Sequence, residues 1–309
     1  MADCVENRSE KRGLLGVVLD QVARLAAISA ATVSPPLPVV DAAAQTSTPV
    51  STPSDTSTTP HQPEATVDRA TYWSLGEARP FAAGKATAGP GYGRLALAAG
   101  YGRPHWIWAG VETSGYLSPY FGCMQAGLHA SGAVVDVSAS FRRTGSFEFG
   151  LIAPVPSVTR AELTRNNDKA RYDSLDASVW GFVPYQRLLL GWEFTYVRPF
   201  NLGDALLFEE VQRVVVGRDG VFTTKLSPML ELLTDASLYV GLMGEQLSLL
   251  GRTRTMVLRL GPSTWARLGD HWSLFGSLTF PVQSPDRLGA WNASYGYIGL
   301  TYAFATGEE

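Results

Sequence analysis

Residues 295–304 read YGYIGLTYAF, and this stretch decides the fold. Taken with a period of two, it places Ile298, Leu300, Tyr302 and Phe304 on one face and small residues on the other. Alternation of this kind is typical of a β-strand, in which successive side chains point to opposite sides. The pattern recurs upstream, and it predicts a series of antiparallel strands from about residue 93 to residue 304.

Turn residues such as those at 201–204 and 217–220 separate the upstream segments. Counted back from the end, the predicted strands cover 290–304, 271–283, 254–268, 237–249, 221–234, 205–216, 187–200, 172–184, 147–157, 133–143, 119–131, 105–117 and 93–102. That count is odd, whereas single-chain bacterial membrane barrels use even numbers. Because Pro154 and Pro156 weaken the segment 147–157, we expect about 12 strands, with 10 or 14 as alternatives.

The composition narrows the class of protein. Only 17% of the 309 residues are charged, below the roughly 25% of an average soluble domain. The net charge is −3 and no basic cluster appears, so we expect no nucleic-acid partner. No run of about 18 apolar residues is present, which excludes an ordinary transmembrane helix.

The two faces of the predicted strands differ in a way that suggests a membrane. The apolar faces carry aromatic residues expected at the membrane interfaces: Trp192, Tyr196, Trp272, Tyr302 and Phe304. The opposite faces carry glycines, hydroxyls and single charges, expected to line a lumen: Glu112, Asp136, Asp176, Glu193, Lys225, Glu231, Glu245, Arg259 and Arg267. A barrel with lipid outside and water or paired charges inside has this pattern.

In its strand spacing, its alternation and its closing strand, the chain resembles the outer-membrane β-barrel proteins of Gram-negative bacteria. The resemblance covers residues 93–304 and implies an all-β, antiparallel up-and-down transmembrane β-barrel in contact with the lipid bilayer. It also implies that Tyr302 and Phe304 belong to the signal read by the outer-membrane insertion machinery. The polar tail 305–309 departs from the family, whose aromatic is usually the last residue.

The N-terminal third suggests export. Residues 1–45 resemble a signal peptide, with basic residues before an apolar stretch, although Asp20 and Arg24 interrupt it. The alternative is an amphipathic helix of a cytosolic protein. Residues 46–70 are rich in Thr, Ser and Pro and are expected to form a disordered periplasmic linker. Residues 71–92, with Pro80, Gly84 and Gly89, are expected to be a transitional segment before the barrel.

The charges of the barrel region bear on function. Residues 93–304 hold 18 Arg and Lys and 17 Asp and Glu. Mixed signs predict a lumen crossed by ion pairs, either a narrow porin-like channel for small solutes or a plugged structural or surface barrel. No cofactor, metal site or catalytic residue is expected, and Cys4 and Cys123 do not form a metal-binding pattern.

Two alternatives stay open. The first is a membrane-embedded lipid-modifying enzyme in which His129 acts as the base beside Ser131, on the same predicted face. The second is a soluble lipocalin-like barrel that binds a small molecule. His105 and His271 adjoin Trp106 and Trp272 near strand ends and are expected to be interfacial residues.

Overall fold

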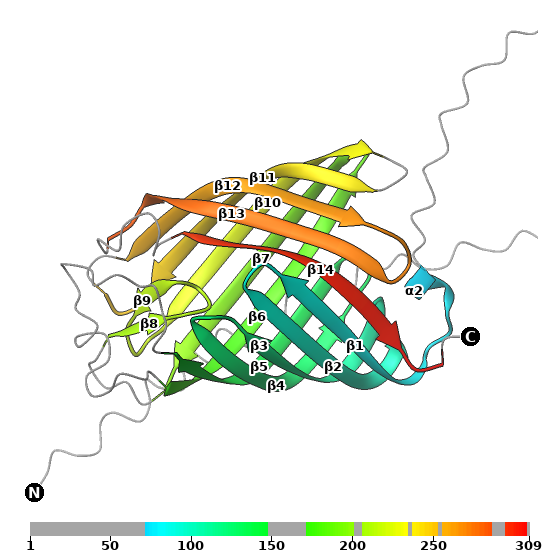
Figure 1. The fold of residues 1–309 in the computed structure, drawn as a ribbon, viewed down its shortest axis with the longest axis horizontal. Coiled ribbons are helices and arrows are strands. Elements are labelled where there is room, and N and C mark those ends of the chain that lie inside the picture. Colours follow the sequence, from blue (N-terminus) through cyan, green and yellow to red (C-terminus); the bar gives the residue numbers. More distant parts are fainter. Residues whose placement is uncertain are drawn as a thin grey trace, which may run out of the picture. The chain divides into compact units, whose positions relative to one another are not determined.

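The computed structural model describes residues 72–147, 171–200, 206–233, 237–252, 255–285 and 294–307. These residues form a closed barrel of twelve antiparallel strands, a small hairpin and one short helix, α2 (Tyr72–Leu75). Figure 1 shows the strands running obliquely around the barrel. The predicted all-β antiparallel barrel of about 12 strands is therefore confirmed.

The barrel strands are 11 to 15 residues long. Their bounds are β1 (Arg79–Gly89), β2 (Tyr92–Arg103), β3 (Ile107–Leu117), β4 (Phe121–Ser131), β5 (Val135–Ser146), β6 (Arg171–Tyr185), β7 (Leu188–Pro199), β10 (Val221–Leu233), β11 (Leu238–Leu249), β12 (Met256–Arg267), β13 (Trp272–Gln283) and β14 (Tyr295–Ala305). About 9–11 residues suffice for a tilted strand to cross a bilayer. Each strand is thus long enough to span one.

Closure of the sheet removes every free edge. Each strand pairs with its neighbour along the chain, except that β7 pairs with β10 across the intervening hairpin. The first and last strands pair with each other from Ala83↔Ala305 to Ala88↔Leu300. In a closed barrel every strand has a hydrogen-bonded neighbour on both sides. A protein surrounded by hydrocarbon requires this, because lipid offers no partner to backbone N–H and C=O groups.

The two ends of the barrel differ. At one end, here called the terminal end, β1 begins, β14 ends, and connections such as 104–106, 132–134 and 186–187 are short. At the other, here called the loop end, the connections 147–170, 200–220 and 284–294 are long. Transmembrane barrels have short turns on the periplasmic side and longer loops outside.

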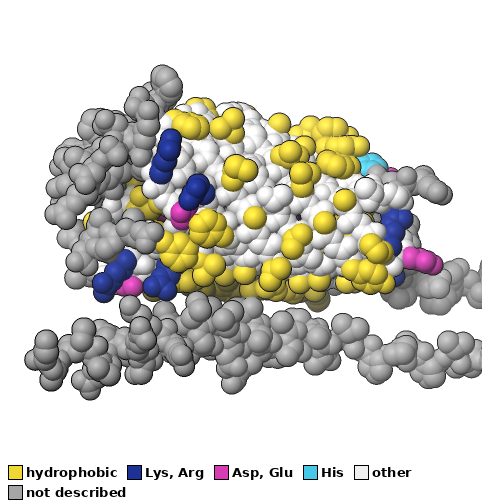
Figure 2. Space-filling view, turned by 90° about the horizontal axis from the view of Figure 1, so that it is seen from below, with side chains coloured by type: hydrophobic (Ala, Val, Ile, Leu, Met, Phe, Trp, Pro, Cys, Tyr) yellow, Lys and Arg dark blue, Asp and Glu magenta, His cyan; other side chains and the backbone are white. Residues whose placement is uncertain are grey.

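The apolar faces of the strands point outward. Leu190, Leu230 and Leu300 expose 43%, 47% and 39% of their surfaces. Figure 2 shows hydrophobic side chains spread over the middle of one face of the barrel, with charged side chains toward its two ends. A water-soluble barrel would bury these side chains, so the outer surface is suited to hydrocarbon and the soluble alternative does not fit.

The segment 205–216 is predicted to be a barrel strand, but its described part, 206–216, is a hairpin instead. It contains β8 (Leu207–Glu209) and β9 (Val214–Val216), which pair with each other and with no barrel strand. All six strand residues are buried, including Glu209. A barrel strand exposes alternate residues to lipid, whereas both faces of this hairpin are covered, because it folds into the barrel.

The first barrel strand lies in 71–92, the segment predicted to be transitional. Pro80 lies before the residues of β1 that pair with β14. Its missing backbone N–H therefore removes no hydrogen bond between β1 and β14. Gly84 faces Phe304 across the seam, and a side chain at Gly84 would collide with the Phe304 ring. These residues therefore close the barrel, although their types suggest breaks.

Several predicted segments lie outside the described residues. They are the signal-like leader 1–45, the linker 46–70 and nearly all of the predicted strand 147–157. The predicted polar tail begins one residue early, because Ala305 still belongs to β14. In the part of the chain that the structure describes, no helix is long and apolar enough to cross a membrane.

Candidate functional site in the barrel interior

The inward faces of the strands hold three groups of charged side chains. The first surrounds Arg142 of β5, whose side chain is 2% exposed. Its Nε lies 2.6 Å from Asp176 Oδ2, and its Nη1 lies 2.8 Å from Glu209 Oε1 on the hairpin. These contacts are ion pairs without good hydrogen-bond directions at the two nitrogens. Arg142 therefore links the barrel wall to the β8–β9 hairpin by charge.

Two hydroxyl groups strengthen this link. Tyr172 of β6 donates to Glu209 Oε1 over 3.0 Å, and the Glu210 backbone N–H donates to the same tyrosine oxygen. Ser146 at the end of β5 donates to Glu210 Oε1 over 2.9 Å. Both acidic residues of the hairpin are thus held by the β5–β6 wall.

The second group surrounds Arg259 of β12. Its Nη1 lies 2.8 Å from Glu245 Oε2 on β11, and neither side chain is exposed. Lys225 of β10 lies 3.3 Å from both carboxylate oxygens of Glu193 and 3.9 Å from Glu245. Burial of charges is tolerated when they are paired in this way.

Arg259 also holds the hairpin. Its Nη2 donates to the backbone carbonyls of Gln212 and Arg213 over 2.9 Å each. In the strand order, β5 and β12 stand five places apart in a ring of twelve. The hairpin is therefore fixed to two nearly opposite walls of the lumen.

The tip of the hairpin reaches a third point. Arg213 has a positive φ of 52° at the turn between β8 and β9. Its guanidinium lies 5.9 Å from the ring centre of Tyr120, in the β3–β4 turn. The hairpin thus extends across the loop end of the lumen.

An apolar cluster inside the barrel supports the hairpin. Val214 and Val216 pack with inward side chains near the loop ends of β7, β10, β11 and β12, namely Val197, Val221, Leu247, Leu249 and Val257. Only polar and small residues are predicted from the sequence for the lumen, and this apolar cluster is an additional part of the interior. Alternation alone could not show it, because a loop segment supplies the other half of the cluster.

The third charged group is centred on His129 of β4. Its Nδ1 lies 2.9 Å from Glu112 Oε2, and its Nε2 lies 3.1 Å from Asp136 Oδ1. Trp108 packs on the imidazole with 4.6 Å between ring centres. Arg94 approaches the other oxygen of Glu112 at 3.7 Å.

This arrangement bears on the predicted His129–Ser131 pair. Carboxylate oxygens accept hydrogen bonds, so both imidazole nitrogens are engaged as donors. The Ser131 hydroxyl donates elsewhere, to the Trp106 carbonyl over 3.0 Å. His129 has no free lone pair directed at Ser131, which a general base would need.

The structure brings most predicted lumen residues together in these three groups, and the other two, Glu231 and Arg267, lie toward the terminal end of β10 and β12. Glu231 of β10 is buried toward the terminal end, and Arg267 of β12 lies 5.9 Å from the Trp265 ring. Sequence reasoning missed Arg142, Glu209 and Arg213. Arg142 lies on the predicted polar face of 133–143, which was the available signal, but nothing local indicates that the hairpin turns inward.

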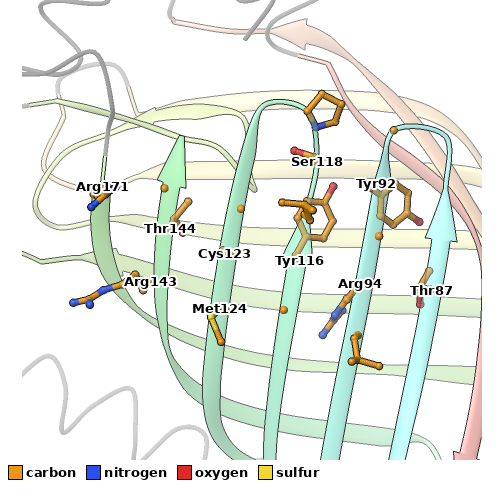
Figure 3. A pocket seen from close by; sticks show the side chains of 18 of the residues that line it. Thr87, Tyr92, Arg94, Tyr116, Ser118, Cys123, Met124, Arg143, Thr144 and Arg171 are labelled. Atoms are coloured by element: carbon orange, nitrogen blue, oxygen red, sulfur yellow. The ribbon is translucent and has the colours of Figure 1, made fainter. Parts of the chain in front are cut away.

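The side of the lumen beside β1–β4 is more open. A cavity of about 1280 Å³ lies toward the loop end and is lined by residues that include Thr87, Arg94, Tyr116 and Cys123. Figure 3 shows these side chains along the neighbouring strands. Tyr92 and Tyr116 stack with 5.5 Å between ring centres, and Tyr92 meets Tyr297 edge to face.

Four of the aromatic residues predicted at the membrane interfaces lie toward one end of the barrel or the other, and Trp192 lies nearer the middle of β7. Trp272, Tyr302 and Phe304 gather at the terminal end, where Trp272 and Tyr302 pair across the strands with ring centres 4.8 Å apart. Tyr196 lies toward the loop end and donates to the Asp219 carbonyl. Trp192 packs beside Phe194 on the same strand.

Helix α2 is fixed at the terminal end. The Trp73 ring meets His105 and His271 edge to face, and its Nε1 donates to the Asp270 carbonyl. His105 Nε2 and His271 Nδ1 contact the carbonyls of Phe304 and Ala303. Burial lowers the pKa of His105, in the β2–β3 turn, to about 4. Both histidines thus join a turn to the last strand.

The described residues contain no cluster of three His, Cys, Asp or Glu that could hold a metal ion. Cys123 is a free thiol facing the lumen.

Solved structures similar to this chain are outer-membrane barrels. The KdgM porin, in complex with disordered oligogalacturonate, is 8% identical over 72% of this chain and 99% of its own, with a TM-score of 0.38. Omp33 of Acinetobacter baumannii is 11% identical over 74% and 98%, with a TM-score of 0.35. The translocator domain of the autotransporter NalP from Neisseria meningitidis is 12% identical over 77% and 91%, with a TM-score of 0.33. No family model and no curated protein matches the chain.

Proposed function

We propose that the protein is an outer-membrane barrel of a Gram-negative bacterium that lets small solutes cross through a narrowed lumen. The observation that carries this proposal is the division of the interior. The hairpin and its ion pairs fill the part of the lumen between β5–β7 and β10–β12, while a cavity of about 1280 Å³ remains on the side of β1–β4. A barrel of this size lies between side-chain-filled barrels and wide porins.

The orientation follows from the lengths of the connections. With the short turns in the periplasm, the loop end and its β8–β9 hairpin lie toward the cell exterior. The leader 1–45 and the linker 46–70, predicted from sequence, would then export the chain and connect to β1 from the periplasmic side. The hairpin would narrow the outer mouth of the lumen.

The insertion machinery is the partner expected during assembly. Phe304 lies near the end of β14 and is 38% exposed on the outer face, and Tyr302 lies two residues before it on the same face. An exposed aromatic at the end of the closing strand suits recognition before the seam with β1 forms.

A plugged structural barrel is the second candidate. The observation favouring it is the attachment of the hairpin to opposite walls through Glu209 and Arg259. Catalysis stays outside the proposal, because both nitrogens of His129 are engaged by carboxylates.

Planar-bilayer recording separates the two candidates. The full-length protein, refolded in detergent, is added to a bilayer after its folding is checked by the heat-dependent shift in gel mobility. Discrete conductance steps smaller than those of a wide trimeric porin would support the channel. Folded protein that inserts but stays electrically silent would support the plug.

A further inference from the structure

We propose that the open side of the lumen prefers anions, and that Lys85 and Arg94 determine this preference. The proposal rests on the channel function above and adds its class of solute, namely small inorganic and carboxylate anions. It depends on which charges in the interior face water, since the total charge of the barrel region is nearly balanced.

The interior carboxylates are largely neutralised by neighbours. Asp176 and Glu209 pair with Arg142, and Glu245 pairs with Arg259, at 2.6 to 2.8 Å. The most exposed of these groups is Glu193, at 35%, and both of its oxygens lie 3.3 Å from Lys225 Nζ. A permeating cation would have to displace a protein cation to bind them.

Two cations on the opposite wall are not covered in this way. Arg94 of β2 is 46% exposed, and its one ion pair among the described residues, with Glu112, is long at 3.7 Å. Lys85 of β1 is exposed and forms no ion pair among the described residues, and it interacts with Glu112 and Asp136 only at longer range. Both ammonium and guanidinium groups can therefore offer donors to a solute.

The position of the two cations suits a passing solute. Thr87 pairs with Arg94 across β1 and β2, and Lys85 lies two residues from Thr87 on the same inward face. Arg94 lines the cavity, beside the stacked rings of Tyr92 and Tyr116. Low-dielectric walls concentrate the field of a charge in a narrow passage and raise the local concentration of counter-ions.

The nearby acids do not cancel this charge. Glu112 and Asp136 are 22% and 11% exposed, and both lie against His129. Because carboxylates only accept, each imidazole nitrogen carries a hydrogen in this geometry. The local set then has three positive groups and two negative ones.

The test is the reversal potential of the full-length protein in a KCl gradient across a planar bilayer, near 0.1 M salt. We expect chloride to be more permeant than potassium. Arg94→Gln and Lys85→Gln should each lower the chloride preference, by roughly threefold if each charge contributes about one kT. Lys85→Arg keeps the charge and should keep the preference.

Arg198→Gln is the matched control, since Arg198 is exposed on β7 and does not line the cavity. It should leave the reversal potential unchanged. A conducting channel that prefers potassium would overturn the anion proposal, and so would a reversal potential that neither Arg94→Gln nor Lys85→Gln changes. Neither result would contradict the channel function. A silent bilayer would instead contradict the channel function, and the heat-dependent gel shift shows whether each variant has folded.

Discussion

Arg142 of β5 and Glu209 of the β8–β9 hairpin form an ion pair of 2.8 Å, and both side chains are almost without solvent contact. The pair joins the wall of a membrane barrel to a segment that closes part of its lumen. If this contact determines the width of the passage, changing it should affect conductance and stability together.

Glu209→Gln should loosen the hairpin. It removes the charge that attracts Arg142, and it weakens the acceptor of the Tyr172 hydroxyl. We expect larger or noisier single-channel conductance and a loss of roughly 1.5–3 kcal/mol in the free energy of unfolding, as for hydrogen bonds to charged groups. Urea titration in detergent and bilayer recording would measure both; the same conductance and stability as wild type would contradict a closing role for the hairpin.

Arg259→Gln should have the larger effect. This substitution removes two bonds to hairpin carbonyls and leaves Glu245 buried with only the 3.9 Å contact to Lys225. Breaking a buried ion pair costs about 3–5 kcal/mol. Arg198→Gln is the control, because Arg198 is exposed on β7. Equal midpoints of urea unfolding for the two variants would rule out this role of Arg259.

The seam between the first and last strands gives a third prediction. Gly84→Ala should destabilise the barrel by about 1–3 kcal/mol, because the new methyl group meets the Phe304 ring. Gly93→Ala is the matched control in β2, since an added side chain there has nothing within 4 Å. Combining Gly84→Ala with Phe304→Leu should recover part of the loss. The gel-shift temperature of each variant measures this; a loss as large at Gly93 as at Gly84 would refute the account of the seam.

Acid should weaken the terminal end through His105. The pKa of His105 is about 4 in the folded chain, against an ordinary value of about 6.5, because burial opposes the charged form. Between these two pH values His105 is protonated in the unfolded chain but not in the folded one. The free energy of unfolding is therefore highest above pH 6.5 and falls as the pH drops. We expect a loss of about 1–2 kcal/mol by pH 5.

His105→Asn provides the control for this titration. Asparagine tolerates the positive φ of 57° at this position and does not titrate. The difference in urea midpoint between pH 7.5 and pH 5 should shrink in this variant. A difference of the same size in both proteins would show that other groups cause the acid sensitivity.

The sequence predicts the barrel well and its interior only in part. Alternation identifies the strands because successive residues face lipid and the lumen in turn. In β7, for example, Leu190 faces outward and Glu193 faces inward. The sequence prediction fails at β1. Pro80 and Gly84 suggest a break in the strand there, but both residues belong to the strand that pairs with β14 and closes the barrel. It fails again at 205–216, which is predicted as a barrel strand although its described part packs inside the lumen.

The pairing of charges was the least predictable feature. Lys225 and Glu193 are register partners across β10 and β7, so a correct register would reveal that contact. Arg142 and Glu209 come from a wall and a loop that no ladder connects. Their contact depends on the hairpin folding inward, which no local pattern indicates.

The most direct test of the central claim measures which face of a strand meets lipid. Cys123 is replaced by serine and Cys4 by alanine, and a spin label is attached at Leu128→Cys or at Lys85→Cys in protein reconstituted into bilayers. Leu128 is 68% exposed on the outer face of β4, whereas Lys85 faces the lumen. We expect that oxygen, which concentrates in hydrocarbon, relaxes the label at 128, and that a water-soluble nickel chelate relaxes the label at 85. A label at 128 that responds mainly to the nickel chelate would contradict a barrel whose apolar side chains face the membrane.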